Sequence, residues 1–105
     1  MASKRTAASK RSKLLLASDY TKSFAKDWHR LSESGRYDMV RLKAVMMQLV
    51  AGDEPLGPEW KDHPLKGEWA DHRECHVGGD FLLIYRVSET AIVFVRAGTH
   101  SELFG

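Results

Sequence analysis

Three short strand-like segments near the C-terminal end restrict the fold of this chain more than any other feature. They span residues 72–77, 80–86 and 91–96, and the second and third are rich in β-branched and aromatic residues. Gly78-Gly79 separates the first two segments and is typical of a two-residue hairpin turn, while Ser88-Glu89 separates the second and third. Strands joined by such short loops are antiparallel neighbours, so the sequence predicts a three-stranded meander.

The two turns also predict which residues lie opposite each other. With these residue pairs as loops, His76 lies opposite Phe81 and Phe81 lies opposite Arg96, so the three form a row across one face. That face continues with Glu74, Leu83, Tyr85, Ile92 and Phe94. The other face carries Cys75, Leu82, Ile84, Val93 and Val95, all of them mid-sized and apolar. We expect helices to cover this second face.

Two amphipathic segments supply those helices. Apolar residues recur at helical spacing in each: Tyr20, Phe24, Trp28 and Leu31, then Met39, Leu42, Val45, Met46, Leu49 and Val50. Gly35 and Gly52 follow as C-terminal stops. Residues 14–16 begin a short first strand, and Ser18 or Asp19 is expected to cap the first helix. Residues 52–67 have neither period and contain all three prolines, which predicts a long loop with a functional role.

The order strand, helix, helix, meander predicts an α+β domain, with two helices packed on one face of an antiparallel sheet. A chain of 105 residues is long enough for one core, so residues 14–105 are assigned to a single domain. Residues 1–13 contain five cations, no acid and almost nothing apolar. Such a segment cannot offset the entropy of ordering, and we expect a flexible basic tail.

The charge is distributed unevenly along the chain. Residues 1–50 contain 11 Lys or Arg and 4 Asp or Glu, a balance of +7, whereas residues 51–105 contain 5 and 10, a balance of −5. A basic half favours a polyanion such as RNA as the partner, although it also fits helices with solvated faces. No apolar run is long enough for a membrane helix, and the single cysteine excludes an internal disulfide. We therefore expect a cytoplasmic protein without a membrane partner.

Polar residues with catalytic chemistry gather at one end of the predicted sheet. His100 follows the last strand closely, Asp80 borders the Gly-Gly turn, and His63 lies in the long loop, free to fold over that edge. Together with His76 and Arg96 they contain the parts that RNA cleavage needs: an acid, a base and a cation that binds phosphate. The alternative is that the histidines are ordinary polar residues and that Arg96 pairs with Asp80 or Glu74.

A metal site is a second alternative. His72, Cys75 and His76 are close in sequence, and His63 could be a fourth zinc ligand. The predicted register opposes this, because Cys75 and His76 point to opposite faces of the sheet. We therefore predict no metal and no cofactor, with Cys75 as a small buried hydrophobic residue.

Four segments carry a resemblance to a known family. They are KDHPLKGEW (61–69), RECH (73–76), DFLLIY (80–85) and RAGTHSELF (96–104). In order and spacing they resemble the YafQ branch of the RelE toxin superfamily. The likeness is dense over residues 61–105 and weaker, at the level of helix pattern, over residues 14–50.

The resemblance implies a function and a set of site residues. Members of that family are ribosome-dependent endoribonucleases that cleave messenger RNA without a metal, and a co-expressed antitoxin holds them inactive. The positions that correspond to the family's functional residues are His63, His76, Asp80, Arg96, His100 and Phe104, with Phe81 where tryptophan is common.

The same resemblance suggests a role for each residue. It implies His100 as the general acid and His76, with Asp80, as the base or its orienting partner. Arg96 would stabilise the phosphate, and His63 would contact the substrate or assist proton transfer. Phe104 would stack on a base, and Phe81 would offer an aromatic surface without an indole N–H.

Two other classes of function remain to be separated from this one. A binding module of the same fold would occupy the ribosome or the antitoxin without cleaving, but it would not need His100 and Phe104. A DNA-binding regulator would fit the basic tail, but neither helical segment has a helix-turn-helix arrangement.

Overall fold

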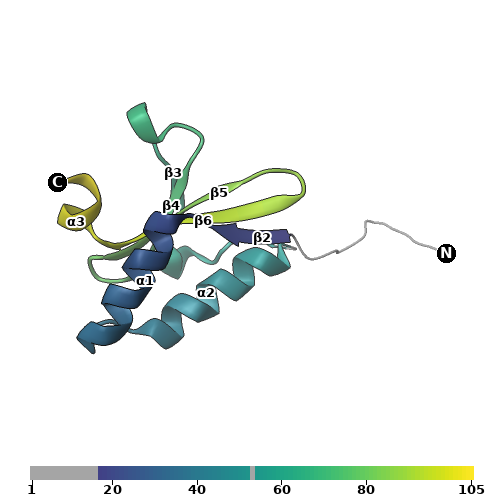
Figure 1. Ribbon diagram of the computed structural model, residues 1–105. Helices are drawn as coiled ribbons and strands as arrows, with labels where there is room; N and C mark the ends of the chain where they lie inside the picture. The colour runs from purple at the N-terminus through teal and green to yellow at the C-terminus, as the bar shows by residue number, and fades with distance from the viewer. Residues whose placement is uncertain (1–16, 53) are drawn as a thin grey trace.

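The computed structural model describes residues 17–52 and 54–105 (Figure 1). Its elements in chain order are β2 (Ala17–Tyr20), α1 (Lys22–Ser34), α2 (Met39–Ala51), η1 (Pro58–Trp60), β3 (His63–Pro64), η2 (Gly67–Trp69), β4 (Arg73–Gly78), β5 (Phe81–Val87), β6 (Ala91–Thr99) and α3 (His100–Phe104). The predicted tail of residues 1–13 and the start of the first strand at 14–16 lie outside the described residues. Within the described residues, no helix is long and apolar enough to cross a membrane.

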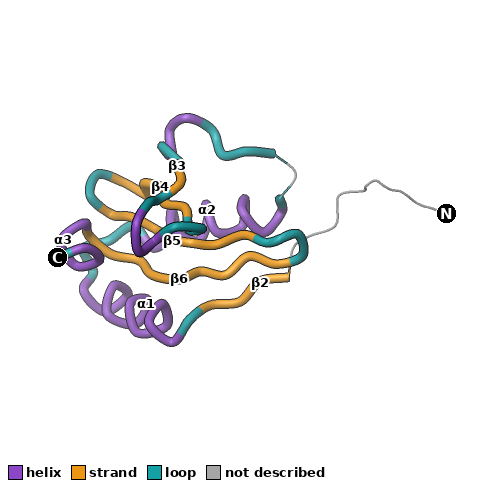
Figure 2. The backbone as a smooth tube through the Cα atoms, turned by 90° about the horizontal axis from the view of Figure 1, so that it is seen from above, coloured by secondary structure: helices purple, strands orange, loops and turns teal. Residues whose placement is uncertain are grey.

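The strands form one sheet in the order β2-β6-β5-β4-β3 (Figure 2). The meander is present, since β4, β5 and β6 are antiparallel neighbours. The α+β class is confirmed, but the sheet is mixed, because β2 runs parallel to β6. A parallel neighbour requires a long connection between the two strands, and α1, α2 and the meander provide it.

Both predicted helices form, and both end where the glycines predict. Gly35 and Gly52 adopt left-handed conformations at φ 71° and 68°, which a residue with a Cβ adopts at a cost. The predicted cap of α1 was wrong, because Ser18 and Asp19 lie within β2. Thr21 is the cap instead: its hydroxyl accepts from Phe24 N at 3.0 Å and donates to Val95 O at 2.7 Å. This residue therefore fixes the helix to β6.

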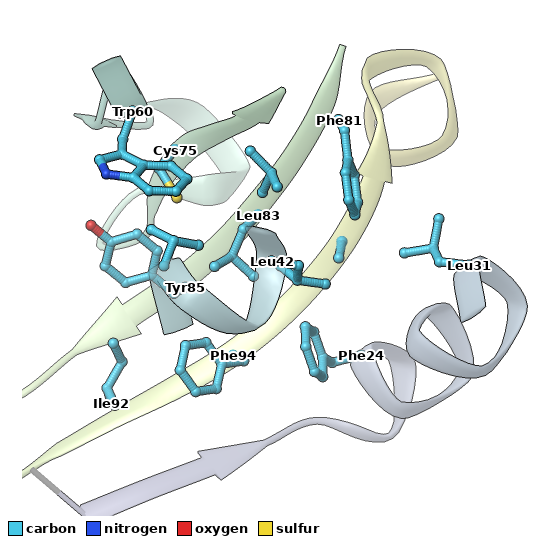
Figure 3. Packing of buried hydrophobic residues seen from close by; sticks show 13 residues of the cluster. Phe24, Leu31, Leu42, Trp60, Cys75, Phe81, Leu83, Tyr85, Ile92 and Phe94 are labelled. Carbon is cyan, nitrogen blue, oxygen red and sulfur yellow. The ribbon is translucent and has the colours of Figure 1, made fainter. Parts of the chain in front are cut away.

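The main core lies between the sheet and the helix pair (Figure 3). Phe24, Leu31, Leu42 and Val45 of the helices pack against Cys75, Val77, Phe81, Leu83, Tyr85, Ile92, Phe94 and Ala97 of the sheet. The helices thus cover the face with the aromatic residues, and the prediction that they cover the Leu82 and Ile84 face was wrong. A smaller cluster of Leu82, Ile84 and Leu103 lies on that other face, with Leu65, Trp69 and Val95 against it.

The predicted register was also wrong, because the sheet contains two irregularities. One lies between His76 and Gly78, so His76 is opposite Leu82 rather than Phe81. Between β5 and β6 the predicted two-residue turn at Ser88-Glu89 was wrong, because Val87 lies opposite Ile92 and residues 88–91 form the loop. A second irregularity, with Val95 as the extra residue of β6, shifts the pairing once more, so Arg96 is opposite Ile84. An extra residue in one strand moves every following side chain to the other face. His76 and Arg96 therefore do share a face, but Phe81 lies on the opposite one.

Candidate active site

One row of residues crosses four strands on the face that α1 and α2 leave uncovered. His63 of β3 lies opposite Glu74, Glu74 lies opposite Ile84, and Ile84 lies opposite Arg96. Residues opposite each other point to the same face, so His63 and Arg96 are the two polar ends of this row. With neighbouring strands about 4.8 Å apart, their backbones are separated by about 14 Å. His76 belongs to the next row, opposite Leu82.

His63 and His76 form a pair around one buried carboxylate. Oε1 of Glu74 lies 3.0 Å from Nε2 of His63 and 3.6 Å from Nε2 of His76, and the ring centroids are 6.1 Å apart. Glu74 is buried, whereas His63 is exposed and His76 partly exposed. The carboxylate lies between the two accessible imidazoles and can orient both rings by hydrogen bonding.

The loop that carries His63 is held against the sheet by the residue before it. Asp62 accepts hydrogen bonds from Arg73, Nε at 3.1 Å and Nη2 at 2.8 Å, and from the hydroxyl of Tyr85. Burial, followed by the hydrogen bond to Asp62, raises the pKa of Tyr85, so its hydroxyl stays a donor. The long proline-containing segment is therefore ordered by β3 and by Asp62 at the point where it delivers His63.

His100 and Phe104 lie on α3, a short helix at the end of β6. Its N-terminus is a capping box, in which Thr99 accepts from Glu102 N and the Glu102 side chain accepts from Thr99 N at 2.8 Å. The ring centroids of His100 and Phe104 are 4.9 Å apart. Phe104 also meets Trp69 edge-on at 5.9 Å. The result is an aromatic group beside an exposed imidazole, suited to hold an unstacked base.

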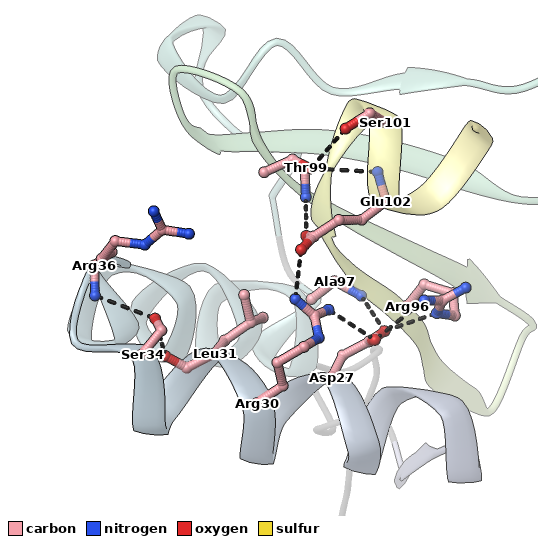
Figure 4. A network of polar contacts seen from close by, with 10 residues as sticks. All are labelled: Asp27, Arg30, Leu31, Ser34, Arg36, Arg96, Ala97, Thr99, Ser101 and Glu102. Atoms are coloured by element: carbon pink, nitrogen blue, oxygen red, sulfur yellow. Dashed lines mark hydrogen bonds and ion pairs between the residues drawn. The ribbon is translucent and has the colours of Figure 1, made fainter.

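Arg96 makes its contacts with α1 rather than with the histidines. Nε lies 2.7 Å from Oδ2 of Asp27, and Nη2 lies 3.1 Å from Oδ1 (Figure 4). The hydrogen bonds to Asp27 raise the pKa of Arg96 against the opposing effect of burial. The guanidinium is therefore a fixed cation at the edge of the sheet face, and its partner is Asp27 rather than Asp80 or Glu74, the partners considered in the alternative interpretation.

The structure brings together only some of the predicted site residues. Asp80 accepts a hydrogen bond from the backbone N of His100 at 3.1 Å, and within residues 17–52 and 54–105 no bond joins it to His76. Phe81 is only 6% exposed and packs on Tyr37 in the main core, with centroids 5.0 Å apart. The expected aromatic surface at Phe81 was therefore wrong. Among the described residues, no hydrogen bond links the His63 pair to His100 and Phe104.

Asp27, the partner of Arg96, was not predicted from the sequence, and Glu74 was considered only as a partner of Arg96. The signal for Asp27 was present, because Phe24, Asp27 and Leu31 recur at i, i+3 and i+7 on the buried side of α1. A carboxylate in an apolar stripe requires a partner. For Glu74 the signal depends on the register, which places it beside His63 only once β3 pairs with β4.

The donor atoms of His63, Glu74 and His76 all lie within 4.8 Å of one another, close enough to hold a metal ion. Two imidazole nitrogens and one carboxylate oxygen suit zinc or copper, and a bound ion would supply a Lewis acid. The zinc ligands suggested by the sequence, which also included His72 and Cys75, do not meet at this point. Cys75 is fully buried in the main core, and His72 packs on Trp69 and hydrogen-bonds Ala70 O.

The family model described as "Bacterial toxin of type II toxin-antitoxin system, YafQ" matches residues 16–105. This chain belongs to the YafQ toxin family. It is similar to the "mRNA interferase toxin YafQ" of Escherichia coli, with 39% identity over 87 residues that cover 83% of this chain and 94% of the relative.

Two solved structures show the same fold as this YafQ-family toxin. YafQ in the E. coli DinJ-YafQ complex is 38% identical with a TM-score of 0.78, covering 86% of this chain and 99% of the other. A metal-bound toxin from Helicobacter pylori is 43% identical with a TM-score of 0.77, covering 86% and 100%.

Proposed function

We propose that this toxin is an mRNA interferase that cleaves messenger RNA on the ribosome by attack of a ribose 2′-hydroxyl on the adjacent phosphodiester. The observation that carries the proposal is that His63, His76 and Arg96 lie on the sheet face left open by α1 and α2. Two imidazoles and a guanidinium are what a metal-free transfer of this kind needs. The E. coli relative is named an mRNA interferase toxin.

Each residue has a role in this proposal. His100 is the general acid that protonates the leaving 5′-oxygen, and His76 is the base that takes the 2′-hydroxyl proton. Glu74 replaces Asp80 as the partner of the base, because its carboxylate lies 3.6 Å from His76. Arg96 offsets the charge that develops on the phosphate, and His63 assists proton transfer from the other side of Glu74.

Phe104 stacks on the base beside the cleaved bond, and Asp80 holds the N-terminus of α3 through His100 N. With one histidine as acid and another as base, the rate has a bell-shaped dependence on pH.

The reaction is proposed to need no metal ion. A metal held by His63, Glu74 and His76 would use the nitrogen lone pairs that proton transfer requires. Cleavage is therefore expected to persist in excess chelator, and added zinc is expected to slow it. Loss of cleavage in chelator, restored by one divalent ion, would contradict this part of the proposal.

Ribosome dependence is proposed from the form of the site and from the charges of the helices. The site has no protein nucleophile, so the message must arrive with its 2′-hydroxyl already aligned for attack. Lys22, Lys26 and Lys43 are exposed on α1 and α2 and are available to bind ribosomal RNA. Because phosphate contacts release counterions, ribosome binding should weaken steeply as salt increases.

An antitoxin is the second proposed partner, as expected for a type II toxin, and the cytoplasm is the proposed location because ribosomes are there. The related YafQ is found in complex with DinJ. Adding the cognate antitoxin before the message should abolish cleavage. Undiminished cleavage by a fully complexed toxin would contradict inhibition by this partner.

The decisive experiment is primer extension on a defined message, with and without programmed ribosomes, beside His100→Ala. We expect discrete in-frame cuts that need both the ribosome and His100. Cuts in bare RNA would support the nuclease activity and contradict its dependence on the ribosome. A folded protein that binds ribosomes without cutting would instead be the non-catalytic binding module.

A further inference from the structure

Asp27 is a buried carboxylate on α1 that no proposed step uses. It is 4% exposed and accepts four hydrogen bonds: two from Arg96, one from Ala97 N at 3.0 Å and one from Arg30 Nη2 at 3.0 Å (Figure 4). Burial by itself would raise the pKa of Asp27, but these bonds outweigh it and hold the pKa below its ordinary value. The side chain is therefore charged at neutral pH.

The position of Asp27 follows from the short first strand. β2 pairs only with residues 91–94, so the outer edge of β6 continues past it without a partner strand. The Asp27 carboxylate lies at this edge and accepts a hydrogen bond from the backbone N–H of Ala97. The same two oxygens hold Nε and Nη2 of the neighbouring Arg96. A two-bond contact of this kind fixes the plane of a guanidinium as well as its position.

One side of that guanidinium is left for another ligand. Within the described part of the chain, Nη1 of Arg96 makes no hydrogen bond, and the side chain is 28% exposed. A phosphate oxygen can therefore bind at Nη1 without breaking the contacts to Asp27. The carboxylate also separates Arg96 from Arg30, whose positive charges would otherwise repel each other.

A second connection runs from Asp27 to α3. Arg30 donates from Nη2 to Asp27 and from Nη1 to Oε2 of Glu102 at 2.7 Å. Glu102 is the residue that completes the capping box of α3 with Thr99. The carboxylate of Asp27 thus lies between Arg96 on one side and, through Arg30, the start of the helix that carries His100 and Phe104.

We propose that Asp27 is a positioning residue for cleavage: it fixes Arg96 directly and, through Arg30 and Glu102, sets the position of α3 with His100 and Phe104. The inference rests on the proposed function, since Arg96 and His100 act there on the phosphate and the leaving oxygen. Asp27 itself touches no reacting atom. Its loss should lower kcat and leave KM nearly unchanged, because it orients groups that act in the transition state.

The test is a set of variants assayed for ribosome-dependent cleavage under single-turnover conditions. Asp27→Asn keeps the size of the side chain and removes its charge, and we expect a loss of about 10- to 100-fold in rate. Glu33→Gln is the matched control, because Glu33 is an exposed carboxylate on the same helix that pairs with His29 and makes no contact with Arg96 or α3 among the described residues. This control should cleave like the wild type.

A double-mutant cycle separates positioning from general loss of structure. If Asp27 acts through Arg96, then Asp27→Asn costs much less in an Arg96→Ala background than in the wild type. The inference would be overturned if Asp27→Asn lowered the cleavage rate by the same factor in both backgrounds, or if it left the rate unchanged. A wild type that does not cleave would refute the proposed function and this inference with it, whereas a cleaving wild type with additive variants refutes only the inference.

Asp27→Asn removes a buried charge and can destabilise the fold, so Arg30→Gln provides an independent measurement. This variant removes the link to α3 and keeps the contact between Asp27 and Arg96. Because the Arg30 pair with Glu102 is partly exposed, the melting temperature should change little. We expect the rate to fall about 3- to 10-fold. A wild-type rate in folded Arg30→Gln would overturn the connection to α3.

Discussion

Leu103→Ala is predicted to release α3 from the sheet while leaving the rest of the fold in place. Leu103 is 7% exposed and packs on Leu82 and Ile84, in the small cluster on the face opposite the two long helices. α3 has only five residues, too few to be stable as an isolated helix. Its position therefore depends on this apolar contact, on the edge-on contact of Phe104 with Trp69, and on the polar contacts of Thr99, Glu102 and His100 N.

The size of the effect follows from the burial. Replacing leucine by alanine removes three carbon atoms, each worth about 0.8 kcal/mol when buried, or about 2.4 kcal/mol in total. Since 1.4 kcal/mol is a factor of ten, the ratio of docked to undocked α3 should fall about 50-fold. Any cavity that remains adds to this loss. His100 and Phe104 would then spend much less time at the site, and the cleavage rate should fall at least about tenfold.

Two measurements on a matched pair of variants test this. Leu83→Ala makes the same chemical change, but Leu83 lies on β5, faces the main core and is fully buried. It should cost about 2–5 kcal/mol of global stability and lower the melting temperature by at least about 8 °C. Leu103→Ala should instead speed amide exchange in residues 100–105, with a much smaller change in melting temperature. Wild-type exchange and a wild-type rate in Leu103→Ala would refute the reasoning.

Three further predictions concern stability and reactivity. The pKa of Asp27 is lower in the folded protein than in the unfolded chain. Its contribution to stability is therefore present above the ordinary carboxyl pKa and is lost as the pH falls through the folded value. In urea unfolding, the free energy of unfolding of the wild type should fall more steeply between about pH 5 and pH 3 than that of Asp27→Asn. Burial raises the pKa of Cys75 to about 12, so iodoacetamide should label it only after unfolding, and labelling of the native protein at neutral pH would contradict its burial. Tyr85→Phe removes the hydroxyl bond to Asp62 and should cost about 0.5–1.5 kcal/mol by chemical denaturation, with faster amide exchange around His63; unchanged exchange there would show that Asp62 does not hold the loop.

The elements of the fold were accessible from local signals. The apolar spacing of Phe24 and Leu31, the glycines after each helix and the turns of the meander all depend on neighbours within a few residues. Such signals predict which segments are helices or strands, because the backbone period is a local property. They missed β3 and α3, whose lengths of two and five residues are too short to show a period.

The candidate site was predicted in its residue types but not in its arrangement. The choice of residues came from the resemblance to the toxin family. The predicted row of His76, Phe81 and Arg96 instead assumed that the strands pair without bulges. Both faces of β5 are apolar, so alternation could not show which one the helices cover. The two irregularities and the longer loop at residues 88–91 moved His76 and Arg96 away from Phe81, which lies in the core.

The sequence by itself determined the α+β class, the helices and the meander, because these depend on the pattern of apolar residues and turn-forming residues along the chain. Only the tertiary structure decided that Glu74 lies between two histidines and that Asp27 holds Arg96. Those contacts join residues that are distant in sequence, and a shift of one residue in the register changes which side chains meet. A buried carboxylate finds its partner only after the strands and helices have packed.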